Sequence, residues 1–303
     1  MATPRIYHPG APRRSAVKTG ADFRGSPLAT GPLACLLLAV TLGFAPGARA
    51  EEGVLLATTT SVRDSGLLDT LLPGFEARSG WRVQVVAVGT GTALRMGAEG
   101  NADLLLTHAP AAEEELVASG AVVGRVPFME NHFVLAGPAD DPAGVAEASS
   151  PADAYRRIAR SSAAYVSRAD DSGTHKREKA LLREAGLPET GGWDGFVRTG
   201  GGMALTLQVA GERRAYVLSD VGTFLAFRDI TGLVALSKPS PAYRNIYALL
   251  RVSPERFPRV HAEAARALET FFLASETREQ IARFGQDRFG RALFVPLAAE
   301  SVP

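Results

Sequence analysis

The sequence is nearly free of cysteine, with one residue, Cys35, among 303. A single thiol excludes a disulfide scaffold and a cysteine-based zinc site. Neither sign of charge is in excess, because 33 basic and 32 acidic side chains leave a net charge of +1. Composition therefore gives no argument for a nucleic-acid partner. The phosphate loop Gly-x-x-x-x-Gly-Lys-Ser/Thr is absent, so we do not expect nucleotide hydrolysis.

Signatures of metal sites and nucleophiles are missing as well. His108, His132, His175 and His261 stand singly, without the paired spacing of metal ligands, so we expect no metal site. The nucleophile elbow Gly-x-Ser-x-Gly does not occur. Ser172 lies three residues before His175, where it is expected to cap a helix rather than to act as a nucleophile. We therefore expect no catalytic residues and no cofactor.

Residues 1–50 differ in composition from the rest of the chain. They contain six basic residues against one acid, Asp22, and an apolar run over residues 33–45 that ends in Pro46-Gly47-Ala48-Arg49-Ala50. The run is too short to span a bilayer, which takes roughly 20 apolar residues. This pattern predicts a secretory signal peptide over residues 1–50, cleaved near Ala50, with a tethered membrane protein as the alternative. Residues 51–303 would then carry 27 basic and 31 acidic side chains, a net charge of −4, and we expect them to form a monomer.

Beyond the signal peptide, apolar strands alternate with amphipathic helices. We expect strands at 54–59, 81–88, 103–107, 133–136, 164–167, 215–218, 233–236 and 246–252. Helices are expected from about 65 to a stop at Gly80, and at 92–97, 113–118, 150–160, 175–185, from 203, 221–228 and across 254–284. Such alternation predicts a parallel or mixed sheet covered by helices. With 133–136 and 247–251 as crossover strands, we expect one lobe of 51–135 plus 248–303 and a second of 136–247.

Four of the predicted strand-to-helix turns are rich in hydroxyl groups and glycine. They are residues 58–61, 89–92, 171–174 and 199–202. In an open α/β sheet, ligands bind outside the carboxyl ends of the strands. A helix N-terminus there offers unpaired N–H groups and the positive end of the helix dipole. One such turn is equally typical of an ordinary helix cap, but four of them predict an anion site with little formal charge.

Arg168 is expected at the same edge of the sheet, directly after the strand 164–167. Its guanidinium carries only donors, which suits an oxyanion. The alternative is a surface ion pair with Asp170 or Asp171. An oxyanion without a proton needs a site of donors only, and Asp220 stays open as either a helix cap or an acceptor in the site.

Several segments in a specific order resemble the extracellular tungstate-binding proteins of ABC transporters. The first two are Ala57-Thr58-Thr59-Thr60-Ser61, followed by 64–68, and Val88-Gly89-Thr90-Gly91-Thr92 within 86–94. Further matching segments are 102–110, 134–138, 140–144, 167–175, 201–203 and 218–223. The resemblance runs from about residue 55 to 297. It departs from the family at Val62-Arg63, where small or aromatic residues are common.

The resemblance implies a type II periplasmic solute-binding protein with an α/β fold of two lobes, each a mixed sheet flanked by helices, and the ligand in the cleft. Its role would be to bind tungstate or molybdate in the periplasm and deliver it to an ABC permease and ATPase, without enzymatic activity. The oxyanion ligands that it implies are Thr59, Thr60, Ser61, Thr92, Arg168, Ser172 and Thr174. The two ions have the same charge and nearly the same size, so the sequence does not separate them. The alternatives are a periplasmic hydrolase and a sensor domain that binds another oxyanion such as phosphate or sulfate.

Overall fold

The computed structural model describes residues 53–297, and the predicted signal peptide, residues 1–50, lies outside them. Ten strands within this range form one mixed sheet in the order β2-β1-β3-β9-β4-β7-β5-β6, with β8 and β10 both paired to β4. The strands are β1 (Gly53–Thr59), β2 (Arg82–Val88), β3 (Leu104–Thr107), β4 (Val126–Gly137), β5 (Tyr165–Ser167), β6 (Phe196–Arg198), β7 (Tyr216–Asp220), β8 (Val234–Ala235), β9 (Arg244–Arg251) and β10 (Val295–Pro296).

Helices follow most of the strands. They are α1 (Thr60–Ser65), α2 (Leu67–Ser79), α3 (Thr90–Ala98), α4 (Pro110–Ala118), α5 (Pro151–Arg160), α6 (Gly173–Glu184), α7 (Met203–Glu212), α8 (Val221–Thr231), α9 (Ala262–Leu273), α10 (Ser275–Arg283) and α11 (Gln286–Phe289), with short 3-10 turns η1 (Val145–Glu147) and η2 (Pro241–Tyr243). The mixed α/β class predicted from the sequence is confirmed. None of the helices in residues 53–297 has the length and apolar character of a membrane span.

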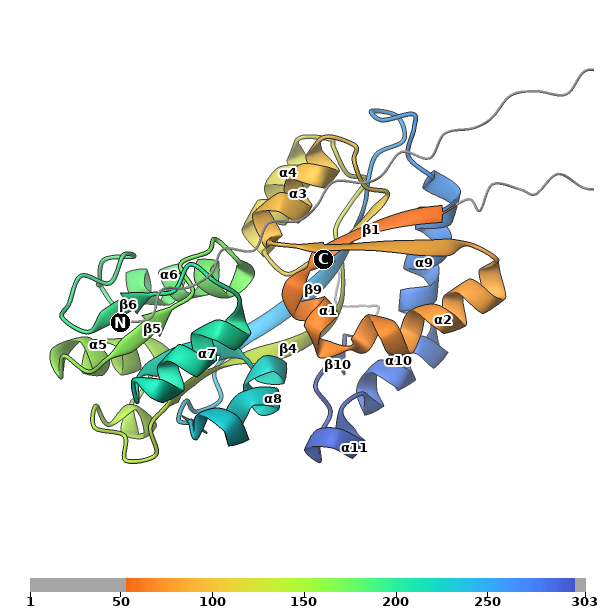
Figure 1. The fold of residues 1–303 in the computed structure, drawn as a ribbon. Helices are drawn as coiled ribbons and strands as arrows, with labels where there is room; N and C mark the ends of the chain where they lie inside the picture. Colours follow the sequence, from red (N-terminus) through yellow and green to blue (C-terminus); the bar gives the residue numbers. More distant parts are fainter. Residues whose placement is uncertain (1–52, 298–303) are drawn as a thin grey trace, which may run out of the picture. The chain divides into compact units, whose positions relative to one another are not determined.

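Two antiparallel strands connect the halves of the sheet. In the first half, β1 pairs in parallel with β2 and β3. In the second half, β5 pairs in parallel with β6 and β7. The long strand β4 pairs with β9 through its first part and with β7 through its last part, so it belongs to both halves (Figure 1). The expected crossover strand 133–136 is therefore the end of a strand that begins at Val126.

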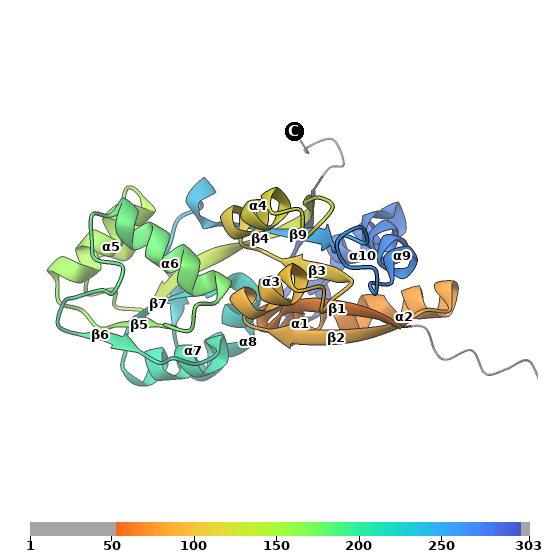
Figure 2. The ribbon, with the colours of Figure 1, turned by 90° about the horizontal axis from the view of Figure 1, so that it is seen from above.

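Each half of the sheet is covered by helices on both faces, and the apolar core is divided accordingly (Figure 2). In the first half, Leu104 and Leu106 pack with α2, α9 and α10, whereas Leu105 packs with α3 and α4. In the second half, Tyr216 packs with α5 and α6, whereas Val217 packs with α7 and α8. Successive side chains of a strand point to opposite faces, so one buried strand supports two cores. The residue boundaries of the two lobes stay a prediction, because β4 is shared.

Two helix predictions need correction, whereas the expected stop at Gly80 is confirmed as the end of α2. Helix α1 begins directly at Thr60, and Gly66, with a φ of 79°, separates it from α2. Pro73 lies inside α2 without ending it; the carbonyl of Asp69 that loses its partner is on an exposed residue, where water can solvate it. The expected helical stretch 254–284 begins only at Ala262, because the chain first crosses from β9 through turns. The short strand β6 lies in a stretch for which no strand was expected.

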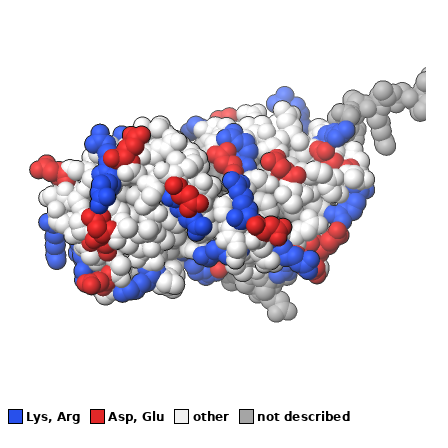
Figure 3. Space-filling model, turned by 60° about the horizontal axis from the view of Figure 1, so that its bottom comes forward, with Lys and Arg blue, Asp and Glu red and all other residues white. Residues whose placement is uncertain are grey.

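Basic and acidic side chains alternate over the surface, and the face in Figure 3 shows no field of a single sign. Many of them are paired in exposed ion pairs, such as Arg78 with Glu276 and Arg214 with Asp140. Such pairs contribute little to stability. The surface pattern agrees with the balanced composition.

Asp103 is one of the few acidic residues that are buried, at 7 % exposure. Its Oδ2 atom accepts a hydrogen bond of 2.7 Å from the backbone N–H of Leu55 in β1, and its Oδ1 atom accepts one of 2.7 Å from the N–H of His261, which precedes α9. One carboxylate thus fixes the start of α9 to the edge of β1 and β3.

We predict that Asp103→Ala lowers the free energy of unfolding by about 2 kcal/mol, because two partly buried N–H groups lose their charged acceptor. The measurement is urea unfolding of residues 51–303. Asp69→Ala, at an exposed position of α2, is the matched control and should change stability by less than about 0.5 kcal/mol. Equal stability of the two variants would show that the Asp103 carboxylate does not connect these elements.

Candidate oxyanion site

The first predicted turn lies where β1 passes directly into α1. Thr59 is the last residue of β1 and precedes α1 in extended conformation, with its side chain buried. Thr60 and Ser61 form the first turn of α1, and the Oγ1 atom of Thr59 lies 3.0 Å from the Oγ atom of Ser61. The hydroxyl groups of this turn therefore gather at the carboxyl end of β1, where an α/β sheet offers its ligand site.

In the second turn, Thr90 contacts the other half of the sheet. Its side chain is 1 % exposed, and its Oγ1 atom accepts a 3.0 Å hydrogen bond from the backbone N–H of Gly173. Thr92, the residue that the resemblance implies, is exposed and accepts a hydrogen bond from Arg95. Both threonines belong to the same Gly-Thr-Gly-Thr turn, and only the fold distinguishes the one that faces residues 171–174.

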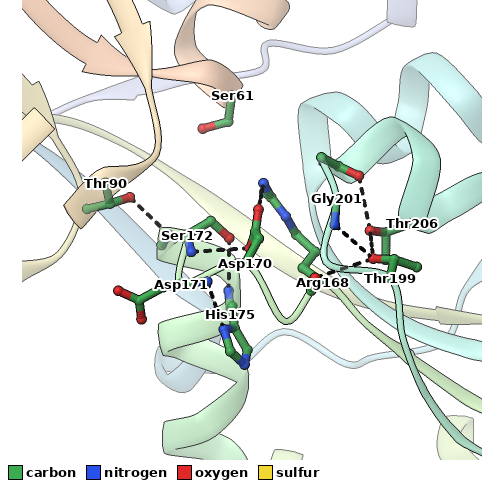
Figure 4. A network of polar contacts seen from close by, with 12 residues as sticks. Ser61, Thr90, Arg168, Asp170, Asp171, Ser172, His175, Thr199, Gly201 and Thr206 are labelled. Carbon is green, nitrogen blue, oxygen red and sulfur yellow. Dashed lines mark hydrogen bonds and ion pairs between the residues drawn. The ribbon is translucent and has the colours of Figure 1, made fainter. Parts of the chain in front are cut away.

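Arg168 is buried, with 5 % of its side chain exposed, directly after β5. Its Nη2 atom lies 2.5 Å from Oδ2 of Asp170, and its Nε atom is buried without a hydrogen-bond partner among the described residues. The Oδ1 atom of Asp170 also accepts a hydrogen bond from the N–H of Ser172. The pair with Asp170 that the sequence left open therefore exists, but it is largely shielded from solvent, and it folds the turn that leads into α6 (Figure 4).

The turn between Arg168 and Ser172 is tight. Ala169 and Asp171 have positive φ angles of 51° and 56°, which are uncommon for residues with a side chain. Asp171 points away from Arg168 and forms ion pairs with Lys176 and Lys179. The carboxylate of Asp170 stabilises the turn by accepting hydrogen bonds on both of its oxygens.

Ser172 caps α6, as the sequence predicted: its Oγ atom accepts a hydrogen bond from the N–H of His175. The Nδ1 atom of His175 accepts a hydrogen bond from the N–H of Asp171, so the imidazole is used to hold the turn. Thr174, in the first turn of α6, is buried. The Ser172, His175 and Asp171 side chains therefore form no catalytic triad.

The fourth turn contacts the backbone of Arg168 through Thr199. The Oγ1 atom of Thr199 lies within hydrogen-bond distance of the carbonyl oxygens of Ser167 and Arg168 and of the Oγ1 atom of Thr206. The N–H of Gly201 donates to the same Thr199 oxygen. Figure 4 shows this cluster beside Arg168. Its contacts fix the backbone of Arg168.

Asp220 was left open by the sequence, and its contacts assign it to α8. Its Oδ1 atom accepts a hydrogen bond from the N–H of Thr223, and its Oδ2 atom accepts one from the Thr223 hydroxyl group. Burial raises the pKa of Asp220, while these hydrogen bonds and the charge of Arg168 oppose the rise. Both oxygens of Asp220 are therefore occupied in capping the helix.

The strands that connect the halves add polar side chains that sequence reasoning missed. Asn131 of β4 and Asn245 of β9 face each other in the ladder, and the Nδ2 atom of Asn245 donates to Oδ1 of Asn131 and to the hydroxyl group of Tyr247. His108, directly after β3, packs its ring 4.9 Å from the ring of Tyr247. Its Nε2 atom lies 3.5 Å from Oγ of Ser61. The sequence offered one signal for these residues, namely that each is a polar residue within or directly after an apolar strand.

His108 is uncharged at neutral pH. Burial lowers its pKa from 6.5 to about 4, Asn245 raises the pKa in part, and the nearby charge of Arg168 lowers it further. Arg168 is thus the cation of a cluster whose other members, Ser61, Thr90 and Ser172, bring hydroxyl dipoles. Within residues 53–297, no group of three histidine, cysteine or acidic side chains is arranged to hold a metal ion.

Comparison with known proteins adds independent findings. The family model described as the PBP superfamily domain matches residues 45–276. The tungstate-binding protein TupA of Peptoclostridium acidaminophilum is 42 % identical over 83 % of this chain and 88 % of its own length. A putative ABC transporter anion-binding protein of Haloferax volcanii is 39 % identical over 86 % of this chain and 77 % of its own length.

Two solved structures have the same fold. The tungstate-binding protein TupA of Desulfovibrio alaskensis superposes with a TM-score of 0.72 at 38 % identity, covering 82 % of this chain and 99 % of that one. The structure described as the tungstate ABC transporter from Geobacter sulfurreducens has a TM-score of 0.67 at 42 % identity, covering 75 % of this chain and 96 % of that one.

We predict that His108 makes stability fall as the solution is acidified. Its folded-state pKa of about 4 lies below the ordinary value of 6.5. An unfolded chain therefore takes up a proton on this residue below pH 6.5, while the folded chain does not. The stabilisation is present above pH 6.5 and is lost as pH falls towards 4, by on the order of 3 kcal/mol in total.

The measurement is urea unfolding of the wild type and of His108→Gln at pH 7, 5.5 and 4. The carboxylates titrate in both proteins, so the difference between the two profiles isolates the histidine. The variant should lose less stability on acidification. Parallel profiles would mean that His108 takes up its proton as readily in the folded state as in the unfolded chain.

Proposed function

The chain belongs to the TupA family of tungstate-binding proteins within the PBP superfamily, and on this premise we propose that it binds tungstate between the two halves of its sheet. The proposed ligand groups are Thr59, Thr60, Ser61, Arg168, Ser172 and Thr174, with Thr90 in place of Thr92. They come from both halves, which are joined by β4 and β9.

One observation carries this proposal: the buried Nε atom of Arg168 has no partner among the described residues. An unsatisfied buried donor costs about 1–3 kcal/mol, and more when it is charged. An oxyanion beside Arg168 would satisfy this N–H and would also accept from the neighbouring hydroxyl groups. The Nε–H group of Arg168 is therefore a buried donor to which the described residues offer no acceptor, and an oxyanion would supply one.

The carboxylates near Arg168 support tungstate over protonated anions. Asp170 accepts from Arg168 and from Ser172, and Asp220 accepts twice from Thr223. Both carboxylates are thus already engaged by donors of the protein. Phosphate at neutral pH carries a proton and needs an acceptor, whereas tungstate is a dianion that needs donors only. Molybdate has the same charge and nearly the same size, so we propose that it binds as well.

We further propose the cellular setting that the family implies. After cleavage of the signal peptide near Ala50, residues 51–303 would act in the periplasm as a monomer and pass the ion to an ABC permease and its ATPase. The lobes would be 51–135 plus 248–303 and 136–247, with closure around the ion. The proposal includes no reaction and no cofactor, and the capping role of Ser172 argues against the alternative of a hydrolase.

We predict that isothermal titration of residues 51–303 gives tight binding of tungstate and molybdate and much weaker binding of sulfate and phosphate. Sulfate is smaller and would make looser contacts. Binding should also stabilise the fold, by about 2.7 kcal/mol at a hundredfold excess of ligand over Kd. Equal affinity for sulfate or phosphate would contradict the tungstate assignment while leaving an oxyanion site.

We predict that Arg168→Ala raises the Kd for tungstate about tenfold to more than a hundredfold, the equivalent of a charge-assisted hydrogen bond of about 1.5–3 kcal/mol. Arg168→Lys should restore only part of the affinity, because an ammonium group lacks the planar fork.

Arg63→Ala is the matched control for this variant. Arg63 lies in α1 next to the first turn, but 55 % of its side chain is exposed and it pairs with Asp64. Its removal should leave the Kd nearly unchanged. If Arg168→Ala binds tungstate as tightly as the wild type, the ion binds elsewhere. If Arg63→Ala loses affinity instead, the arginine that binds the ion lies in the first half.

A further inference from the structure

We propose that Gly173 is the point at which the two halves lock around the bound ion, and that its lack of a side chain makes the lock possible. The proposal rests on the proposed binding of an oxyanion between the halves. It assigns a positioning role to a residue that donates no side chain to the ion.

Two residues of the first half contact Gly173 from different directions. Thr90 accepts the hydrogen bond from the Gly173 N–H, at 3.0 Å. The ring of His108 fills the space where a side chain would stand: a Cβ atom on Gly173 would lie 2.2 Å from Cε1 and 2.7 Å from Nδ1 of His108. Carbon atoms do not approach so closely, so any side chain here must move His108 or separate the halves.

Contacts restrict the movement of His108 on the sides away from the cavity that it lines. Its side chain is buried at 7 % exposure, its ring packs against Tyr247, and its Nε2 atom lies 3.5 Å from the hydroxyl group of Ser61. A ring held on these sides differs from the flexible end of an aliphatic side chain, such as Leu105 beside Gly97. The steric conflict would therefore fall on the contact between the halves.

The contact lies within the proposed site. Ser172 and Thr174 flank Gly173 at the start of α6, and Thr90 belongs to the opposite turn. On the other side, His108 and Gly173 line a cavity of about 460 Å³ between α4 and α6, whose lining also includes Asn245. A separation of 1 Å at Gly173 would stretch the hydrogen bonds that an ion makes to both halves beyond their normal length, and would open the site towards this cavity.

The test is the Kd for tungstate of Gly173→Ala in residues 51–303, measured by titration. We expect an increase of about tenfold or more, in line with the cost of one extra methyl group in a packed contact. The unfolding midpoint without the ion should stay near that of the wild type, because the proposed closure requires a form in which the halves stand apart and the methyl group meets no ring. Small-angle scattering should show contraction on adding tungstate in the wild type and less contraction in the variant.

Two comparisons make the result specific. Gly124→Ala introduces the same methyl group where nothing lies within 4 Å of it, and its affinity should equal that of the wild type. In a His108→Ala background the ring is gone, so adding Gly173→Ala should change the Kd by less than about twofold. Strictly additive effects would show that the methyl group does not act through His108.

The outcomes separate this proposal from the one on which it rests. A wild-type protein that fails to bind tungstate overturns the proposed function. A wild type that binds tungstate together with a Gly173→Ala variant of equal affinity overturns the lock alone. Reduced affinity of Gly173→Ala that is relieved in the His108→Ala background supports it.

Discussion

The buried charge of Arg168 is the constraint around which the second half of the molecule is organised. A guanidinium at 5 % exposure requires a partner, and Asp170 supplies it at 2.5 Å. That contact bends the chain through Ala169 and Asp171, both with positive φ, and directs the N–H of Ser172 to the same carboxylate. This pair therefore shapes the turn that leads into the start of α6.

Because Asp170 neutralises the charge of Arg168, an ion bound here must be stabilised by other groups as well. The pair with Asp170 carries no net charge, so a dianion bound beside it must be stabilised largely by dipoles of hydroxyl and N–H groups. Dipoles act over a short range, and this chain takes them from turns on both halves. Contact between the halves is therefore a condition for enough donors to reach the ion, which explains why a close approach such as Gly173 to Thr90 and His108 matters.

The sequence was sufficient for the features that depend on local pattern. Buried strands, glycine helix ends and the four hydroxyl turns follow from periodicity and turn chemistry, and the order of motifs indicated the family. It was insufficient where a choice depended on three-dimensional contacts. Thr90 and Thr92 are equivalent in the motif, yet one is 1 % exposed and the other lies at the surface. His108 was given no role in the site because it stands alone in the sequence. Its burial depends on the pairing of β3 with β9, which local sequence pattern does not reveal.

A buried acid of α6 explains how the strained turn is kept rigid. Glu178 of α6 accepts hydrogen bonds from Ser167 and Tyr165 of β5. Burial raises the pKa of Glu178 to about 7, with these bonds opposing the rise. The bonds fix the strand end before Arg168 to the helix after it, while Thr199 holds the carbonyl oxygen of Arg168. Because the backbone on both sides of the turn is fixed, we expect Arg168 to stay in place when an ion binds, and we expect the proposed closing movement to occur in β4 and β9.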